Sequence, residues 1–144
     1  MRVERFDGDP SELAAAFEGL VPQLSKSNPP PTVDAVADML WSDAVTQFVA
    51  RDDDERIIGV STLITFRIPT GLRAWIEDVI VDEASNGQGI GSALTTAMVD
   101  HARSLGCTTV ELTSRPSREA ANHMYKKLGF EPRETNVYRY DLRR

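Results

Sequence analysis

Cysteine is almost absent from this chain, with Cys107 as its single thiol among 144 residues. One thiol cannot form an internal disulfide, which excludes a small secreted scaffold held together by cysteine pairs. The sequence also has no apolar run near the roughly 20 residues of a membrane span. Its first ten residues, MRVERFDGDP, contain no apolar signal core. We therefore expect a cytoplasmic protein with no membrane partner.

Basic residues are in deficit, with 16 Lys and Arg against 22 Asp and Glu and a net charge of −6. A non-specific nucleic-acid binder would show the opposite balance, so nucleic acid is not an expected partner. The acidic balance is compatible with amine substrates. Hydrophobic residues make up 41% and charged residues 26% of the chain, as in ordinary globular proteins. This length and composition predict one domain spanning residues 1–144.

Hydrophobic periodicity predicts the element order β-α-α-β-β-β-α-β-α-β, a mixed α/β fold. The predicted strands are residues 2–6, 46–51, 56–68, 74–81, 108–113 and 137–142. Helices are predicted after the N-caps Asp9, Thr32 and Ser117 and after the glycine loop at 86–91. Gly106 and Gly129 are placed to end the last two helices. The first half is expected to be antiparallel, and a strand–helix–strand unit follows.

A glycine-rich loop, Asn86 to Gly91, connects a predicted strand to a predicted helix. Glycine lets the backbone turn sharply and approach a ligand closely. The first N–H groups of a helix have no partner within it, and the helix dipole adds positive charge there. Together these features favour a phosphate or pyrophosphate site, although a glycine-rich connection without a ligand is the plain alternative. The spacing does not fit the dinucleotide motif G-x-G-x-x-G, and no Gly-Lys-Ser/Thr follows as in a P-loop.

The segment from Trp75 to Leu94 resembles the acyl-CoA-binding motif of the GNAT superfamily of N-acetyltransferases. The superfamily pattern Gln/Arg-x-x-Gly-x-Gly/Ala falls on residues 86–91, where both glycines match and Asn86 replaces the first residue. That departure removes a side chain expected near the pyrophosphate, and Gln88 is a candidate substitute. A second segment, Ser117 to Phe130, resembles the later helix of the superfamily, A-x-x-x-Y-x-x-x-G-F.

The resemblance implies a GNAT-like fold, with a mostly antiparallel mixed sheet of about six or seven strands and about four flanking helices. It also implies acetyl-CoA as cosubstrate, no metal, and a possible homodimer. The residues expected by resemblance to bind the cosubstrate are Val79, Ile80, Val81, Asn86, Gly87, Gln88, Gly89, Ile90, Gly91, Ser92 and Asn122. The three strand residues would pair through their backbone with the pantetheine amides. A solvated helix residue is the alternative reading of Asn122.

Two residues are candidates for catalysis. Glu77 is the candidate base, because a carboxylate within an apolar strand is costly unless it has a partner or a wet cavity. Its competitors are Asp78, which strict alternation would place on the opposite face, and a water chain. Tyr125 is the candidate acid, since the matching tyrosine of the superfamily lies near the CoA sulfur. The alternatives are a structural ion pair for Glu77 and an ordinary core aromatic for Tyr125.

These residues predict an acetyl-CoA-dependent N-acetyltransferase acting on a primary amine of a small molecule or peptide. Direct attack in a ternary complex is expected, because no activated nucleophile is visible. The alternative is a non-catalytic acyl-CoA sensor or regulatory module. The sequence does not identify the acceptor amine.

Overall fold

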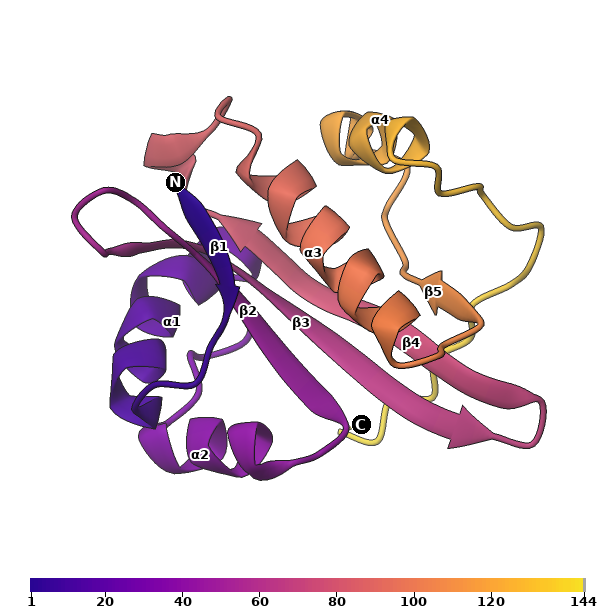
Figure 1. The fold of residues 1–144 in the computed structure, drawn as a ribbon, viewed down its shortest axis with the longest axis horizontal. Coiled ribbons are helices and arrows are strands. Elements are labelled where there is room, and N and C mark those ends of the chain that lie inside the picture. The colour runs from indigo at the N-terminus through magenta and orange to yellow at the C-terminus, as the bar shows by residue number, and fades with distance from the viewer. Residues whose placement is uncertain (144) are drawn as a thin grey trace. The chain divides into compact units, whose positions relative to one another are not determined.

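The computed structural model describes residues 1–143 and divides the chain into two compact units, residues 1–113 and the chain from Ser114 onward (Figure 1). The first unit contains β1 (Arg2–Arg5), α1 (Pro10–Leu24), α2 (Val33–Trp41), β2 (Val45–Arg51), β3 (Ile57–Ile68), β4 (Gly71–Val81), the 3-10 helix η1 (Glu83–Ser85), α3 (Ile90–Ser104) and β5 (Thr109–Glu111). The second unit contains α4 (Glu119–Lys127). Each unit is described by itself below.

The sheet of the first unit has the order β1-β2-β3-β4-β5. Its first three pairings are antiparallel, and β4 pairs with β5 in parallel. This confirms the predicted mixed, mostly antiparallel sheet and its strand–helix–strand unit, β4-α3-β5. The sheet has five strands in the described chain, however, rather than the expected six or seven.

The missing element is the strand predicted over residues 137–142, which form no strand in the described chain. The alternation of apolar and polar residues there suits a strand, but a strand also needs a neighbouring edge for its N–H and C=O groups. No such edge pairs with these residues, and Tyr138 and Tyr140 are 87% and 85% exposed. That prediction was therefore wrong.

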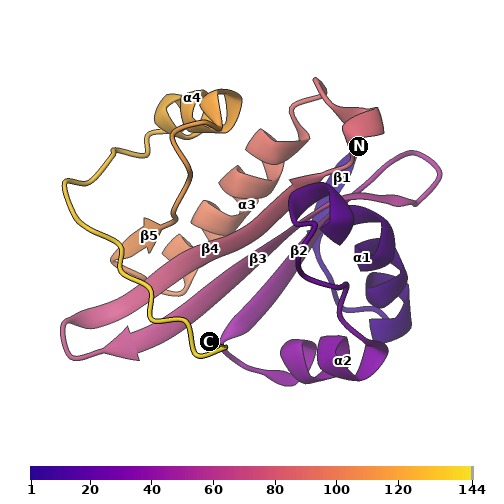
Figure 2. The same ribbon diagram turned by 180° about the vertical axis from the view of Figure 1, so that it is seen from behind.

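Helices α1 and α2 cover one face of the sheet, and α3 covers the other (Figures 1 and 2). Both predicted caps on the first face are confirmed. The Asp9 carboxylate accepts a hydrogen bond from the Ser11 N–H at 2.8 Å, and Thr32 Oγ1 accepts one from the Ala35 N–H at 3.1 Å. The core beneath these helices contains Leu13, Phe17, Leu20, Val36, Val49, Val60 and Ile80.

Helix α3 packs against the opposite face of the sheet. Leu94, Met98 and Ala102 are completely buried at four-residue spacing, which gives the helix one apolar stripe. The helix ends as predicted at Gly106, whose φ of +83° is left-handed, while the Cys107 N–H bonds back to the Ala102 carbonyl. The start of α3 is therefore held at a fixed place over the sheet.

In the second unit, α4 begins one residue later than predicted. Arg118 rather than Ser117 occupies the N-cap position, and no side chain caps the helix there. Its end agrees with the prediction, because Gly129 has a φ of +103° and the Phe130 N–H bonds to the Tyr125 carbonyl. The helix therefore keeps Tyr125 on its last turn, where the side chain is buried.

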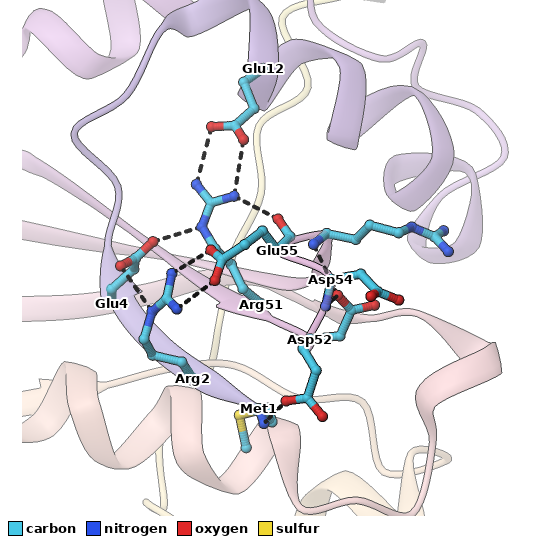
Figure 3. A network of polar contacts seen from close by, with 10 residues as sticks. Met1, Arg2, Glu4, Glu12, Arg51, Asp52, Asp54 and Glu55 are labelled. Atoms are coloured by element: carbon cyan, nitrogen blue, oxygen red, sulfur yellow. Dashed lines mark hydrogen bonds and ion pairs between the residues drawn. The ribbon is translucent and has the colours of Figure 1, made fainter.

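An ion-pair network joins β1, α1 and the turn between β2 and β3 (Figure 3). The Arg51 guanidinium donates to both Glu12 oxygens at 2.9 and 3.1 Å and to Glu4 at 2.7 Å. Arg2 forms a two-bond pair with Glu55 at 2.9 and 2.7 Å. The Glu12 carboxylate thus binds Arg51 instead of returning to the Asp9 N–H as in a capping box. The hydrogen bond from Arg51 holds the pKa of both the Glu12 and the Glu4 carboxyl below its ordinary value.

Substitution of Arg51 with methionine is expected to lower the stability of the fold at neutral pH and to reduce its loss of stability in acid. A carboxyl with a depressed folded-state pKa contributes stability above its ordinary pKa of 4.5, and that stability is lost as the pH falls through the folded-state value. We therefore expect the unfolding midpoint of the wild-type protein to fall more steeply than that of Arg51→Met below this pH, as measured by urea denaturation. Arg56→Met is the control, because Arg56 makes no ion pair within residues 1–143. Parallel acid profiles for wild type and Arg51→Met would contradict the assignment.

Candidate functional site

The edge of β4 that faces β5 is open over half its length. The two strands pair only where Arg73, Ala74 and Trp75 lie opposite Thr109, Val110 and Glu111. Beyond Trp75 the strand continues to Val81 without a strand partner on that side in the described chain. Such an edge offers N–H and C=O groups that an extended amide-containing ligand can pair with.

A β-bulge lies in the open part of β4. The register against β3 shifts between Val60, opposite Ile80, and Thr62, opposite Glu77. The bulge includes Asp78, which has a left-handed φ of +48°. The extra residue breaks strict alternation, so the prediction that Glu77 and Asp78 face opposite sides of a regular strand does not hold. Bulges of this kind redirect backbone groups and are frequent next to active sites.

The glycine loop follows β4 by way of η1. Gly87 and Gly89 have left-handed φ values of +81° and +72°. A Cβ atom built on either glycine would meet nothing within 4 Å, so the space beside both is open. These glycines are therefore required by backbone conformation rather than by crowding. Their exposed surface leaves room for a ligand to approach the main chain.

The loop ends at the first turn of α3. Gly89 occupies the N-cap position and no side chain caps the helix, so the free N–H groups of this turn have no side-chain acceptor. Ile90 anchors the turn, because its side chain is 2% exposed and packs closely on Gly59 of β3. An uncapped, rigidly held helix start beside open space can bind a phosphate group. The geometry at the start of α3 therefore suits the anion site that the sequence predicts.

A contact from α1 fixes the other end of the loop. Gln23 Oε1 accepts a hydrogen bond from the Glu83 N–H at 2.9 Å, while its Nε2 donates to the Gly19 carbonyl at 3.1 Å. Asp82 caps η1 by accepting from the Ala84 N–H at 3.2 Å. The sequence did not indicate Gln23 as a residue of the site. Its hydrogen bond with Glu83 joins residues 60 positions apart, and no local sequence pattern predicts such a contact.

The remaining predicted residues of the first unit lie on this path. Asn86, Gly87, Gln88 and Gly89 are exposed, Val79, Val81, Gly91 and Ser92 are half-buried, and Ile80 and Ile90 are buried. Because the Ile80 side chain belongs to the core under α1, only its backbone is available to a ligand. The structure thus brings these residues together on the segment from the open edge of β4 to the start of α3.

Both candidate bases on β4 are exposed. The expectation that Glu77 is buried among apolar residues was wrong, because its side chain is exposed. Glu77 Oε1 accepts a hydrogen bond from the Trp75 indole N–H at 2.9 Å. Residues two apart on a strand share a face, and this bond orients the carboxylate on the open part of β4. A hydrated, oriented carboxylate can accept a proton directly or through water.

Tyr125 and Asn122 lie on α4 in the second unit. The Tyr125 ring makes an edge-to-face contact with Phe130, with ring centroids 5.6 Å apart. Burial raises the pKa of the Tyr125 phenol, and the charge of Arg118 opposes this only in part. The hydroxyl therefore keeps its proton at neutral pH. The Asn122 side chain donates to the Arg115 carbonyl at 2.9 Å and so closes the turn before α4.

Within residues 1–143 there is no group of three or more His, Cys, Asp or Glu side chains arranged to hold a metal ion. In the same part of the chain, no helix combines the length and apolar character needed to cross a membrane.

Comparison with known proteins agrees with this architecture. Residues 13–130 match the model of the Acetyltransferase (GNAT) family. The chain is 35% identical over 138 residues to a glucosamine 6-phosphate N-acetyltransferase of Trypanosoma brucei brucei, covering 92% of this chain and 90% of that protein. It is also 35% identical over 95 residues to N-alpha-acetyltransferase 30 of Schizosaccharomyces pombe, covering 66% of this chain and 63% of that protein.

A solved structure gives the same result for the fold. The crystal structure of a Trypanosoma brucei acetyltransferase superimposes with a TM-score of 0.79 at 28% identity and covers 98% of this chain and 99% of that chain. The family match spans most of the chain and includes both segments that carry the resemblance. The chain therefore belongs to the GNAT family of acetyltransferases.

Proposed function

We propose that this protein transfers the acetyl group of acetyl-CoA to a primary amine of a small molecule or peptide. The observation that carries the proposal is the continuous path from the open edge of β4 through the left-handed glycines to the uncapped start of α3. The helix start suits a diphosphate, and the strand edge suits an amide-containing arm. Acetyl-CoA has both groups, in that order along its length.

The proposed chemistry is direct attack in a ternary complex. The amine nitrogen forms a bond to the thioester carbonyl carbon, and the C–S bond breaks to release CoA thiolate. An alkylammonium has a pKa near ~10.4, so removing its proton at pH 7 costs about 4–5 kcal/mol. We assign that proton to Glu77, directly or through water, with Asp78 as the competing base. We assign protonation of the leaving thiolate to Tyr125, whose phenol holds its proton at neutral pH.

The acceptor is proposed only as a class. The two relatives described above are named for glucosamine 6-phosphate and for N-alpha acetylation, so amino sugars and α-amino groups both belong in the first screen. We propose a small-molecule amine as the first choice, because the amino-sugar relative matches the whole chain more fully.

The test is release of CoA thiol from acetyl-CoA in the presence of glucosamine 6-phosphate, glucosamine, polyamines, amino acids and short peptides. We expect saturable, amine-dependent release with at least one acceptor class. Acetyl-CoA should also raise the unfolding temperature, as any ligand of the folded state does. Stabilisation without release across the panel would favour an acyl-CoA sensor, and the absence of both would overturn the proposal.

A variant pair tests the glycine loop itself. Gly89→Val places a β-branched residue at a φ of +72°, and left-handed backbone costs roughly 1–2 kcal/mol for an L-residue. We expect the dissociation constant for acetyl-CoA to rise by at least about tenfold, which corresponds to ~1.4 kcal/mol. Gly19→Ala is the matched control, because Gly19 lies on α1 and a Cβ there meets nothing within 4 Å. Equal affinities in the two variants, measured by calorimetry, would remove the loop from the site.

A further inference from the structure

Gln47 of β2 is a polar side chain buried within the sheet, where it is only 2% exposed. Burying an amide is costly unless its hydrogen bonds are made. Its Nε2 donates to the Ser61 carbonyl at 2.8 Å and to the Phe48 carbonyl at 3.1 Å. Its Oε1 accepts a hydrogen bond from the Thr62 hydroxyl at 2.9 Å. The Gln47 side chain is therefore held from both ends by residues of the sheet.

The two carbonyl groups fix the orientation of the Gln47 amide. If the amide were turned over, its own oxygen would face two carbonyl oxygens, and none of the three atoms could donate. The amide oxygen therefore faces Thr62, and the Thr62 hydroxyl must donate its proton to it. A hydroxyl group has one proton and two lone pairs. Toward any further group, Thr62 therefore offers lone pairs alone.

Thr62 lies directly opposite Glu77 in the pairing of β3 with β4. Opposite residues share a face of the sheet, with Cβ atoms about 4.5–5.5 Å apart. Val60, two residues before Thr62, belongs to the core under α1, so this is the face that carries α1 and α2. Figure 2 shows β3 and β4 continuing past both helices. Thr62 is half-buried there and Glu77 is exposed, so a ligand can reach both.

The Glu77 carboxylate has one oxygen to spare. Its Oε1 accepts from the Trp75 indole N–H at 2.9 Å, and among residues 1–143 no other hydrogen bond reaches this carboxylate. The second oxygen and the Thr62 lone pairs thus form a pair of acceptors without a donor. A protonated primary amine carries three N–H donors and a positive charge. A nitrogen about 2.9 Å from each oxygen is at ordinary hydrogen-bond distance from both.

We propose that Thr62 binds the acceptor nitrogen together with Glu77, and that Gln47 is the positioning residue that keeps the Thr62 hydroxyl an acceptor. The inference rests on the proposed acetyl transfer, since it takes Glu77 to face the acceptor amine. One N–H of the bound ammonium donates to Glu77 and a second donates to Thr62. When the first proton moves to Glu77, its bonding electrons stay on nitrogen as the lone pair. The bond to Thr62 still holds the neutral nitrogen in place.

This arrangement selects acceptors by the number of N–H donors that they carry. A protonated primary amine can serve both oxygens at once. A protonated tertiary amine has a single N–H, which the negative charge of Glu77 attracts more strongly than the neutral Thr62 hydroxyl does. Thr62 therefore contributes to the binding of a primary amine and not to the binding of its N,N-dimethyl derivative.

The test is titration calorimetry of amines into the full chain saturated with CoA, which has no acetyl group to transfer. The probes are glucosamine 6-phosphate, glucosamine, polyamines, amino acids and short peptides, and then the N,N-dimethyl derivative of the tightest of them. We expect Thr62→Val to raise the dissociation constant of the tightest primary amine by at least about tenfold, as for a hydrogen bond to a charged group. Thr62→Ser, which keeps the hydroxyl, should change it by less than about threefold. The N,N-dimethyl derivative should bind wild type and Thr62→Val equally.

The matched control is Thr65→Val. Thr65 is also half-buried on β3, but alternation places it on the face that carries α3. Equal primary-amine affinities in wild type and Thr62→Val would overturn the proposal. An equal loss for the primary amine and its N,N-dimethyl derivative would also overturn it, because that result indicates a general disturbance of the site.

The same titrations separate this inference from the proposed function. A wild type that binds none of the amines would overturn both. Amine binding that depends on Thr62, without release of CoA from acetyl-CoA across the same panel, would overturn the acetyl transfer and support the ammonium site. Release of CoA that is unaffected by Thr62→Val at subsaturating amine would overturn the role of Thr62 alone.

Gln47→Met tests the positioning role. The variant removes the acceptor for the Thr62 proton, so the hydroxyl is free to turn and donate to Glu77 in competition with the amine. We expect the primary-amine dissociation constant to rise by at least about threefold in the wild-type background and to stay unchanged in the Thr62→Val background. A rise of equal size in both backgrounds would overturn the role of Gln47. Urea denaturation checks the fold, and the Thr62 variants, which keep Gln47, decide the proposal if Gln47→Met does not fold.

Discussion

Tyr125→Phe is expected to lower kcat by about 10²–10⁴-fold, the usual contribution of a general acid. The substitution removes one hydroxyl oxygen and leaves the ring, so the edge-to-face contact with Phe130 is preserved. The thiolate of CoA would then leave without a proton donor, at a cost that appears in the chemical step. The acetyl-CoA dissociation constant should change by less than about threefold, since the hydroxyl is assigned to the leaving group rather than to binding.

The control for this variant is Tyr138→Phe. Tyr138 is also a tyrosine, but its side chain is 87% exposed and it lies outside the predicted site. Steady-state kinetics on the best acceptor, with acetyl-CoA affinity measured separately, distinguishes a chemical role from a binding role. Equal kcat for the wild type and Tyr125→Phe would remove Tyr125 from the mechanism and leave water as the proton donor.

The pH dependence of the reaction offers a related check. Burial raises the pKa of the Tyr125 phenol above its ordinary value of 10.0. An acid with a raised pKa remains protonated, and thus active, across the neutral and mildly alkaline range. A decline of activity that begins well below that value would assign the alkaline limb to a group other than Tyr125.

The sequence was a good guide wherever short-range chemistry decides the structure. The caps Asp9 and Thr32 and the terminating glycines Gly106 and Gly129 act through bonds within a few residues. The same holds for the left-handed glycines of the loop, because a strand–glycine–helix sequence leaves few alternatives for the backbone.

The sequence was a poor guide wherever distant segments meet. The bulge at Asp78 depends on the register against β3, and adjacent acids within the strand were its only local signal. Aspartate tolerates left-handed backbone better than most residues, so the residue type is consistent with the bulge without predicting it. The Gln23 contact with Glu83 crosses 60 positions and leaves no local trace.

The strand predicted over residues 137–142 failed for a similar reason. These residues have the alternation of a strand, but the hydrophobic period specifies which face is apolar and not which strand pairs with it. The failure concerns the partner of the segment rather than its own pattern.

Gly59→Ala is expected to destabilise the protein by about 1–3 kcal/mol, the usual cost of overpacking a core. A Cβ atom at this position would lie 2.9 Å from Ile90 Cγ2 and 3.2 Å from Leu94 Cδ1. Leu94 can rotate its terminal methyl away, but Ile90 Cγ2 is attached directly to Cβ, and the χ1 rotation that would move it is restricted for a β-branched residue in a helix. The added alanine favours the strand by roughly 0.5–1 kcal/mol relative to glycine, which is too little to offset the clash.

Ile90→Ala alone is expected to cost about 2–5 kcal/mol, because it leaves a cavity. The double variant Gly59→Ala, Ile90→Ala should lose less stability than the two single variants lose together, because the methyl added by Gly59→Ala then fills the space left by the Ile90 side chain. A coupling of roughly 0.5–3 kcal/mol is expected for residues in contact. Urea denaturation of the four proteins measures it directly.

The control cycle pairs Gly59→Ala with Met98→Ala. Met98 is equally buried on the same helix but lies two turns further along, so these two changes should add within about 0.5 kcal/mol. Coupling of equal size in both cycles would mean that the helix responds as a whole rather than at the Gly59 contact.

The same cycle connects packing to function. If Gly59 lets α3 approach the sheet, Gly59→Ala displaces the first turn of the helix by a few tenths of an ångström and moves the N–H groups proposed to bind the diphosphate. Acetyl-CoA affinity should then fall with Gly59→Ala and recover in part when Ile90→Ala is added, although the double variant is less stable than the wild type. If Gly59→Ala loses stability but keeps its affinity for acetyl-CoA, the glycine does not contribute to the binding site. If the double variant regains affinity while remaining less stable than the wild type, binding depends on the position of α3.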